Sequence, residues 1–524
     1  MKRIIFLIMA SLLVIGLILP GCATSENLRP VLYVFKDGKI DVGIAGELNS
    51  TAGAMQWAGA TLAQEAINRN GGVDIGGVSY IVELVPIETG EETVDPSGLT
   101  GVINLTAAID NVNFVLGGFR TEAVEVYRDV AMDKGMIFID CGAAAETLQH
   151  SVVDDYAGYR FWFKGTPYNE YFSGESVVRI LGAVAMKLRG EMGVAANYTL
   201  NATIIADNSE WAWKQVVVIR ELLGGINVNL VRDPYWVDAT GNTIEMQTAL
   251  NTTAGFDPQF IIPIFSANAG VLYDELRASC IPNAMSVGIN AMAQLKSPWS
   301  ANLTTAPPGG PACANEVILD TWAEGLNQTS KTAAFLAAFM NFTSGEYPLN
   351  TAATYDALFG LKAAIEAVAK YNAVNGTAYA KADDIIKWLE DPANAQVTTT
   401  GNITYYPRPR TAAAGKPALT EAQVRSLYDL DSYNYTYTYE AKDWTMPPHT
   451  THDLVYGPGR LTGIGAQWQW DATAGQWKKV GVWPMDFGDE YDEALTDQYG
   501  CWNFAYNGTM ALVIPQNVIA HHKP

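Results

Sequence analysis

Short apolar runs alternate with stretches of helical periodicity in the first third of the chain. The run IDVGIAG at 40–46 fits a buried strand. Apolar residues from Met55 to Ala66 then recur at every third or fourth position, until Asn70 and Gly71 end a predicted helix. The elements predicted next are strand 80–87, helix 97–111, strand 113–118, helix 121–134 and strand 136–140. This alternation predicts a parallel sheet covered by helices.

A second series of the same kind follows. Its predicted elements are helix 171–189, strand 201–207, helix 210–223, strand 228–231, strand 260–265 and strand 285–289. No internal repeat with a period of about 20–50 residues is visible, which excludes a solenoid. The pattern therefore predicts an α/β protein with two open sheets. Such sheets bind ligands beyond the carboxyl ends of their strands, commonly between two domains.

The N-terminus has the pattern of an export signal. Lys2 and Arg3 precede an apolar run at 4–19, which is shorter than the roughly 20 residues that cross a bilayer. Pro20, Gly21 and Cys22 follow, in an order that resembles the lipobox of exported lipoproteins. Cys22 would then be lipidated and become the first residue. The alternative is an ordinary secretory signal with an accidental cysteine, and both interpretations export the protein.

Twelve N-x-T sequons support export. Their asparagines are Asn49, Asn104, Asn197, Asn201, Asn251, Asn302, Asn327, Asn341, Asn375, Asn402, Asn434 and Asn507. So many glycan acceptors indicate loops exposed outside the cytoplasm. The source would be a eukaryote or an archaeon, and the lipobox favours an archaeon.

The composition limits the range of partners. With 524 residues, 49% hydrophobic and 11% aromatic, the chain can build two or three domains with real cores. The formal net charge of -22 repels nucleic acid and anionic lipid headgroups. We therefore expect no nucleic-acid partner, and membrane contact through the lipid anchor alone.

Cysteines and histidines give no metal or disulfide framework. Cys141, Cys280, Cys313 and Cys501 are too dispersed for a zinc motif or a disulfide scaffold. We predict a Cys280–Cys313 bridge as the preferred pair, and Cys141–Cys501 as the weaker one. The pairs at 449 and 452 and at 521 and 522 have no third convergent ligand in the sequence, so we interpret them as surface histidines and expect no metal.

Catalytic motifs are missing as well. The sequence has no G-x-S-x-G, H-E-x-x-H or Walker A pattern. Cys141 with His150 would be the best nucleophile and base, but a cysteine after a buried strand is usually inert packing. We expect a protein that is not an enzyme and that needs no cofactor.

Four segments resemble a known family. They are IDVGIAGELNSTAGAMQWAGATLAQEAINRNGGV, NFVLGGFRTEAVEVYRDVAMDKGMIFID, TAATYDALFGLKAAIEA and GAQWQWDATAGQWKKVGVWP. Their order and spacing are similar to the type 1 periplasmic binding proteins, in particular the branched-chain amino acid and amide receptors of ABC transporters. The resemblance implies two Rossmann-like lobes with parallel sheets joined by a hinge.

The resemblance also implies a division of the chain. The segments are a signal peptide at 1–21, a lipid-anchored tether at 22–38, lobe 1 at 39–163 and 318–380, lobe 2 at 164–317, 381–404 and 461–487, an insertion at 405–460 and a C-terminal extension at 488–524. Within the insertion, YNYTYTYE at 433–440 alternates strictly and predicts a strand with tyrosines on one face.

Ligand positions of the family carry over to both lobes. In lobe 1, Phe119, Arg120 and Thr121 match the turn that holds a ligand carboxylate, and the start of a helix there favours anions. Thr121 can equally be a simple helix cap, and Arg120 can equally be a solvated surface residue. Gly142, Ala143 and Ala144 match a second clamp, where Ala144 lacks the usual threonine hydroxyl. The matching positions in lobe 2 are Trp211, Ser266, Ala267 and Asn290.

Trp211 either closes over the ligand or packs in the core. Asn290 stands where the amino acid receptors often carry a glutamate that pairs with the ligand ammonium. Asn290 and Ala144 argue against a plain α-amino acid, because a desolvated ammonium without a carboxylate is costly. An amide, a urea-like compound, a small carboxylate or a short peptide fits instead. If Glu122 or Glu88 replaces the missing carboxylate, amino acids fit as ligands as well.

The resemblance thus implies an extracytoplasmic, lipid-anchored receptor that delivers a small polar ligand to an ABC transporter permease. The alternative is a structural or sensory surface protein that kept the fold and self-associates through its tyrosine-rich insertion.

Overall fold

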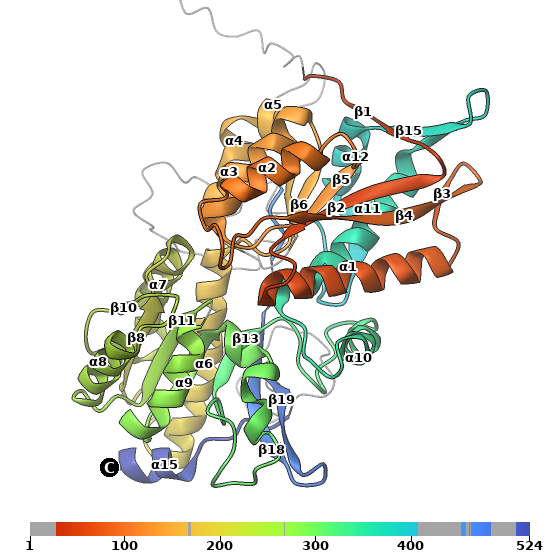
Figure 1. Ribbon diagram of the computed structural model, residues 1–524. Coiled ribbons are helices and arrows are strands. Elements are labelled where there is room, and N and C mark those ends of the chain that lie inside the picture. The colour runs from red at the N-terminus through yellow and green to blue at the C-terminus, as the bar shows by residue number, and fades with distance from the viewer. Residues whose placement is uncertain are drawn as a thin grey trace, which may run out of the picture.

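The computed structural model consists of two α/β lobes, one above the other in Figure 1. It describes residues 28–165, 169–266, 268–406, 452–456, 461, 463–483 and 510–524. The predicted signal peptide, Cys22, the tyrosine-rich strand, Cys501 and Ala267 lie outside these ranges. Within them, no helix combines the length and the hydropathy needed to cross a bilayer.

The first lobe is built on a six-stranded sheet in the order β3-β4-β2-β5-β6-β7. Its strands are β2 (Lys39–Gly46), β3 (Val73–Ile75), β4 (Val78–Glu88), β5 (Phe114–Gly117), β6 (Phe138–Asp140) and β7 (Trp162–Lys164). All neighbours are parallel except β3 and β4. The helices are α1 (Thr51–Arg69), α2 (Leu99–Ala108), α3 (Thr121–Lys134), α4 (Thr147–Asp154), α5 (Tyr156–Tyr159), α10 (Thr332–Phe342), α11 (Thr354–Val368) and α12 (Ala382–Leu389).

The second lobe has a sheet in the order β10-β8-β11-β12-β13-β18-β19, with β9 beside β8. Its strands are β8 (Leu200–Asp207), β9 (Val228–Leu230), β10 (Tyr235–Val237), β11 (Phe260–Phe265), β12 (Met285–Asn290), β13 (Val317–Asp320), β18 (Ile464–Asp471) and β19 (Gln476–Trp483). Its helices are α6 (Glu170–Met192), α7 (Glu210–Leu222), α8 (Thr243–Ala254), α9 (Ala269–Cys280) and α15 (Gln516–His522). The strands from β8 to β13 are parallel, and β18 and β19 close the sheet as antiparallel strands.

Smaller elements complete the two lobes. A three-stranded sheet joins β1 (Leu32–Phe35), β15 (Thr377–Lys381) and β14 (Lys370–Asn372), and β16 (Gln396–Val397) pairs with β17 (Asn402–Ile403). Short 3-10 helices are η1 (Leu223–Ile226), η2 (Ala291–Gln294), η3 (Ser297–Asn302), η4 (Asn350–Ala353) and η5 (Pro392–Asn394).

The sheets confirm the predicted fold class and explain why the strands were readable. All six residues of β11 are buried, as are the last five of β2, because helices cover both faces of a parallel sheet. The strands and helices predicted between 40 and 140 and between 171 and 289 are present, with small differences at their ends.

Two predicted lobe boundaries differ from the structure. Strand β13 belongs to the second sheet, although residues 318–380 are predicted in lobe 1. Helix α12 packs on α11 and β15 of the first lobe, although residues 381–404 are predicted in lobe 2.

The described part of the insertion runs beside β7, where the chain passes between the lobes. The N–H of Lys164 donates to the carbonyl of His452 at 3.0 Å. Within the insertion, the N–H of Tyr406 donates to the carbonyl of Asp453 at 2.9 Å, and the N–H of His452 donates to the carbonyl of Tyr406 at 2.8 Å. The His452 ring is fully buried and stacks on Phe163 with 3.9 Å between centroids. The interpretation of His452 as a surface histidine is therefore wrong, because the ring packs against Phe163 and Tyr156 of the first lobe.

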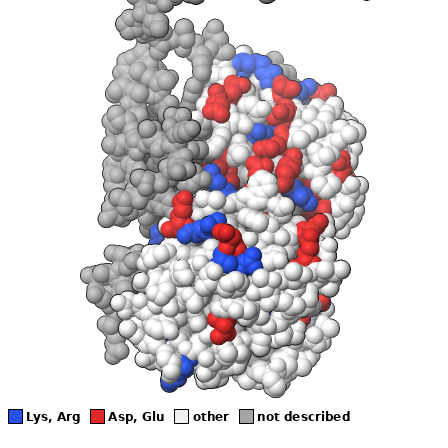
Figure 2. All heavy atoms as spheres, turned by 90° about the vertical axis from the view of Figure 1, so that its left-hand side faces the viewer, with Lys and Arg blue, Asp and Glu red and all other residues white. Residues whose placement is uncertain are grey.

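The charged side chains and the sequon asparagines are unevenly exposed on the surface. On the face shown in Figure 2, charged side chains gather over the first lobe, while the second lobe is mostly uncharged. Among the sequons, Asn49, Asn197, Asn251, Asn302, Asn327, Asn341 and Asn375 are exposed, Asn104, Asn201 and Asn402 are half-buried, and Asn434 and Asn507 lie outside the described residues. Glycosylation itself stays a prediction.

Candidate functional site

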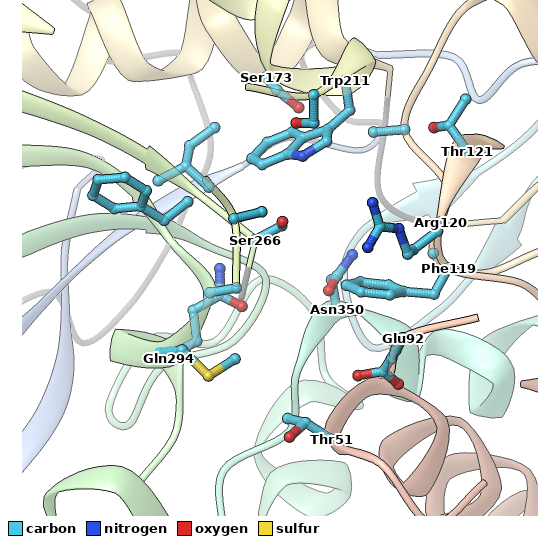
Figure 3. A pocket seen from close by; sticks show the side chains of 18 of the residues that line it. Thr51, Glu92, Phe119, Arg120, Thr121, Ser173, Trp211, Ser266, Gln294 and Asn350 are labelled. Atoms are coloured by element: carbon cyan, nitrogen blue, oxygen red, sulfur yellow. The ribbon is translucent and has the colours of Figure 1, made fainter. Parts of the chain in front are cut away.

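A cleft of about 290 Å³ lies between the two lobes. Its walls come from the segments that follow β5 and β6 in the first lobe and β8, β11, β12 and β13 in the second, so residues from both lobes face one another across it (Figure 3). The cleft thus lies at the carboxyl ends of the parallel strands, as expected for two open α/β sheets.

The turn after β5 forms the first-lobe wall. Gly117 and Gly118 have positive φ angles of 121° and 88°, and a Cβ atom on Gly117 would lie 2.1 Å from the carbonyl of Ala45. Only glycine allows this sharp turn. It brings Phe119, Arg120 and Thr121 to the cleft, where Thr121 starts α3 (Figure 3).

A buried carboxylate supports this turn from behind. Glu91 accepts the N–H groups of Phe119 at 3.1 Å and Arg120 at 2.9 Å, and the Thr89 hydroxyl at 2.9 Å. Burial raises the pKa of Glu91 to about 7. These two N–H groups are therefore occupied by the protein itself, so the Arg120 guanidinium and the Thr121 hydroxyl are the polar side-chain groups that this turn offers to a ligand.

The turn after β6 is held by a buried ion pair. Asp140 accepts the N–H groups of Gly142 at 3.1 Å and Ala143 at 3.0 Å, and its other oxygen pairs with Lys164 at 2.7 Å, with both side chains fully buried. Burial raises the pKa of Asp140, and Lys164 opposes that rise. Gly142 and Ala144 line the cleft, whereas Ala143 is buried in the core, so its predicted role as a ligand contact is wrong.

The second-lobe wall begins in the first turns of α7. Ser209, Trp211 and Gln215 line the cleft. The Ser209 hydroxyl, the Trp211 indole Nε1 and the Gln215 Oε1 are buried and have no hydrogen-bond partner among the described residues. Trp211 thus lines the cleft between the lobes, with no partner for its N–H among the described residues.

Ser266, after β11, forms another part of this wall. Its N–H and hydroxyl both donate to Asp207, at 2.8 Å and 2.7 Å. Asp207 is buried, which raises its pKa to about 6. The neighbouring Ala267 lies outside the described residues, so its role stays a prediction.

Asn290 does not face the cleft, which corrects its predicted role. The residue is fully buried, and its amide donates to Asp274 at 2.9 Å, on the side of α9. Its neighbours Ile289 and Ala291 line the cleft instead. Successive side chains of a strand point to opposite faces, so a shift of one residue along β12 decides whether a side chain faces the cleft or α9. Asn290 therefore gives no reason to exclude an α-amino acid as the ligand.

Three carboxylates line the described part of the cleft, and each already has a partner. Glu92 accepts the N–H groups of Ala52 and Gly53 at the start of α1, both at 3.0 Å. Asp320 pairs with the buried Lys479. Glu122 lies 4.0 Å from Arg120. Burial raises the pKa values of Glu92 and Asp320.

The sequence pattern did not identify several lining residues. Glu92, Ser173, Gln215, Gln294, Asp320 and Asn350 belong to this group. Their position relative to the strands could have identified three of them. Glu92, Gln294 and Asp320 lie at or shortly after the carboxyl ends of β4, β12 and β13. Glu88, by contrast, does not line the cleft, and its carboxylate accepts the N–H groups of Leu48 and Gly90.

The predicted disulfide is absent from the structure. Cys280 and Cys313 are free thiols, as is Cys141. Cys280 ends α9 and accepts a hydrogen bond from Gln247 at 2.9 Å, whereas Cys313 is buried in a separate hydrophobic cluster. Cys141 is fully buried, and burial raises the pKa of its thiol well above the ordinary value, so the thiol stays protonated at neutral pH.

Solved structures with the same arrangement include a putative branched-chain amino acid ABC transporter protein from Silicibacter pomeroyi. Its TM-score is 0.55 at 17% identity, over 86% of this chain and 98% of that chain. This is the type 1 periplasmic binding protein fold. A solute binding protein from R. palustris in complex with benzoate has a TM-score of 0.53 at 13% identity, over 84% of this chain and 96% of that chain.

A third structure with the type 1 fold is the branched-chain amino acid transporter substrate binding protein of Streptococcus pneumoniae in complex with isoleucine. It has a TM-score of 0.50 at 20% identity, over 67% of this chain and 87% of that chain. No protein-family model and no curated protein matches the sequence. At these identities the type 1 fold is established by structure, and the ligand has to be argued from the cleft.

Proposed function

We propose that the protein is an extracytoplasmic, lipid-anchored solute-binding protein that delivers a small ligand to the permease of an ABC transporter. The observation that supports this most is a set of buried polar atoms in the cleft without partners among the described residues. They are Thr121 Oγ1, Ser209 Oγ, Trp211 Nε1, Gln215 Oε1 and Gln294 Oε1. Leaving such an atom unsatisfied costs about 1–3 kcal/mol, so donors and acceptors from both lobes favour a polar guest between them.

The charges of the cleft favour a ligand with an acceptor group rather than a cation. Among the described lining carboxylates, Glu92 is engaged by backbone N–H groups and Asp320 by Lys479. This leaves Glu122, beside Arg120, as the carboxylate that an ammonium would have to use. Arg120 and Thr121 lie together on the first-lobe wall and suit a carboxylate or an amide carbonyl (Figure 3).

Apolar residues elsewhere in the cleft lining favour an apolar body on the same ligand. Phe265, Ile289, Met292 and Leu319 line the second-lobe side of the cleft. Benzoate and isoleucine, the ligands of two solved structures with this fold, both join a carboxylate to an apolar group. We propose a small carboxylate or amide with an apolar body as the preferred ligand, ahead of α-amino acids, urea-like compounds and short peptides.

Transport requires that the lobes close on this ligand. Two lobes joined by crossing segments can close by hinge bending, and a ligand that contacts both lobes stabilises the closed form. The closed form would then dock on the permease. Export and lipidation at Cys22 are supported by the sequence pattern of residues 1–22.

A thermal-shift screen tests the proposal. The panel contains benzoate, benzamide, L-isoleucine, urea and diglycine, added to the purified exported protein. A ligand at 100 times its Kd adds about 2.7 kcal/mol to the free energy of unfolding. We expect benzoate and benzamide to raise the Tm more than L-isoleucine does. No shift with any member would contradict the proposed function, and a preference for L-isoleucine would contradict the proposed ligand class alone.

A further inference from the structure

The helix α15 brings two adjacent histidines to the amino edge of the second sheet. Val518 and Ile519 are buried, and the Asn517 amide donates to the carbonyl of Pro282 at 2.6 Å. These contacts hold α15 against the lobe, next to α6 (Figure 1). His521 and His522 at the end of the helix thereby meet the loops that precede β11 and β12.

The structure supplies the third convergent ligand that the sequence did not reveal. Asp257 Oδ1 lies 2.8 Å from His521 Nε2. One potential ligand atom from each of Asp257, His521 and His522 lies within 4.8 Å of the other two. Asp257 and His521 are exposed and His522 is half-buried, so an ion can reach the group from solvent.

The surroundings of His522 determine its tautomer. Gln259 Oε1 accepts the N–H of Asn201 at 2.7 Å, so the Gln259 amide nitrogen faces His522 Nδ1, at 2.9 Å, as a donor. Nδ1 is therefore an acceptor with a lone pair. The other nitrogen, Nε2, must carry the hydrogen, because it lies 3.0 Å from the carbonyl of Asn283, which can only accept. An N–H held by a backbone carbonyl fixes the tautomer of a metal-binding histidine. In His522 it leaves the Nδ1 lone pair, which accepts from the Gln259 amide, as the ligand atom.

We propose that Asp257 Oδ1, His521 Nε2 and His522 Nδ1 bind a divalent transition metal, with Zn²⁺ as the best match. Two imidazoles and a carboxylate form a donor set that zinc accepts, with bonds of about 2.0–2.2 Å and water in the remaining position. Binding requires that the Gln259 amide give up its hydrogen bond to Nδ1 and that Asp257 and His521 separate slightly. The metal would fasten α15 to the loop before β11.

This site is distinct from the ligand cleft. Asp257 precedes β11, whereas Phe265 at the other end of that strand lines the cleft. The length of a six-residue strand at about 3.3 Å per residue separates the two ends. The metal would therefore act on the attachment of α15 and leave ligand binding unchanged.

Calorimetric titration with Zn²⁺ tests the proposal on the full exported chain without a polyhistidine tag, after treatment with a chelator. The wild type should bind one Zn²⁺, and Co²⁺ in its place should give the visible absorption of a low-coordinate site. Asp257→Asn, which keeps a hydrogen bond to His521, and His522→Ala should each weaken Zn²⁺ binding at least tenfold. Asp110→Asn, an exposed carboxylate in the other lobe that pairs with Lys134, is the matched control and should bind as the wild type does.

Zn²⁺ should also raise the Tm of the wild type and of Asp110→Asn, but not of Asp257→Asn. If Zn²⁺ does not bind the wild type, or binds Asp257→Asn and His522→Ala with unchanged affinity, the proposal is wrong and the three groups only make hydrogen bonds within the protein. Because benzoate binding is measured separately, this outcome is independent of the proposed transport function.

Discussion

Replacing the buried Glu91 with glutamine tests how the turn after β5, which lines the cleft, is held. Burial raises the pKa of Glu91 from 4.5 to about 7, so the folded protein holds this proton more tightly than the unfolded chain does. The stabilising contribution is therefore fully present below pH 4.5 and is lost as the pH rises through 7. A glutamine stays neutral at every pH and can still accept the N–H groups of Phe119 and Arg120.

The size of the effect follows from the two pKa values. At 1.36 kcal/mol for each unit of pKa, the difference corresponds to a loss of about 3 kcal/mol in the wild type between pH 4.5 and pH 8. Glu146 and Asp207 also have raised pKa values through burial, so the stability of the wild type falls further over the same range. The comparison of wild type with Glu91→Gln isolates the contribution of Glu91.

Urea unfolding without ligand at pH 5 and pH 8 measures this difference. We expect Glu91→Gln to gain about 2–3 kcal/mol relative to the wild type on going from pH 5 to pH 8. Glu65→Gln, an exposed glutamate on α1, is the control and should show no such gain. An equal pH dependence in wild type and Glu91→Gln would refute the reasoning, because the carboxylate would then be charged and well solvated in the folded protein.

Three further predictions concern the cleft, the core and the anchor. Trp211→Ala should weaken benzoate binding in calorimetry at least tenfold, whereas Trp213→Ala on the same helix, whose side chain points to solvent and is half exposed, should bind normally. Asn290→Asp places a carboxylate beside the buried Asp274 and should lower the free energy of unfolding in urea by about 3 kcal/mol, and an unchanged midpoint would contradict the placement of Asn290. Cys22→Ala should release the protein from the membrane fraction, and retention there would count against lipidation.

The fold was predictable because its signals are local. Buried parallel strands such as β11 appear as continuous apolar runs, and the glycine after α3 marks the end of that helix. Thr121 and Trp211 were predicted from the family resemblance, and each lies four residues after the end of a strand, β5 and β8.

The rest of the site depends on contacts that no local pattern encodes. Asn290 was misplaced because a shift of one residue along β12 turns a side chain away from the cleft. Asn350, the first residue of η4, lines the cleft although it is far in sequence from the other lining residues. The Cys280–Cys313 bridge required a distance that the sequence does not give. His521 lies 264 residues from Asp257 in sequence, so the convergence of the two is visible only in the fold.

Calorimetric titration of benzoate into the wild type and the double variant Arg120→Gln, Thr121→Val tests the central claim most directly. The account predicts one benzoate per wild-type chain and at least a tenfold weaker affinity in the double variant, with the control Thr248→Val, an exposed threonine on α8, binding as the wild type does. If benzoate binds the wild type and the double variant equally well, the ligand does not lie in the cleft between the lobes, and the account is contradicted.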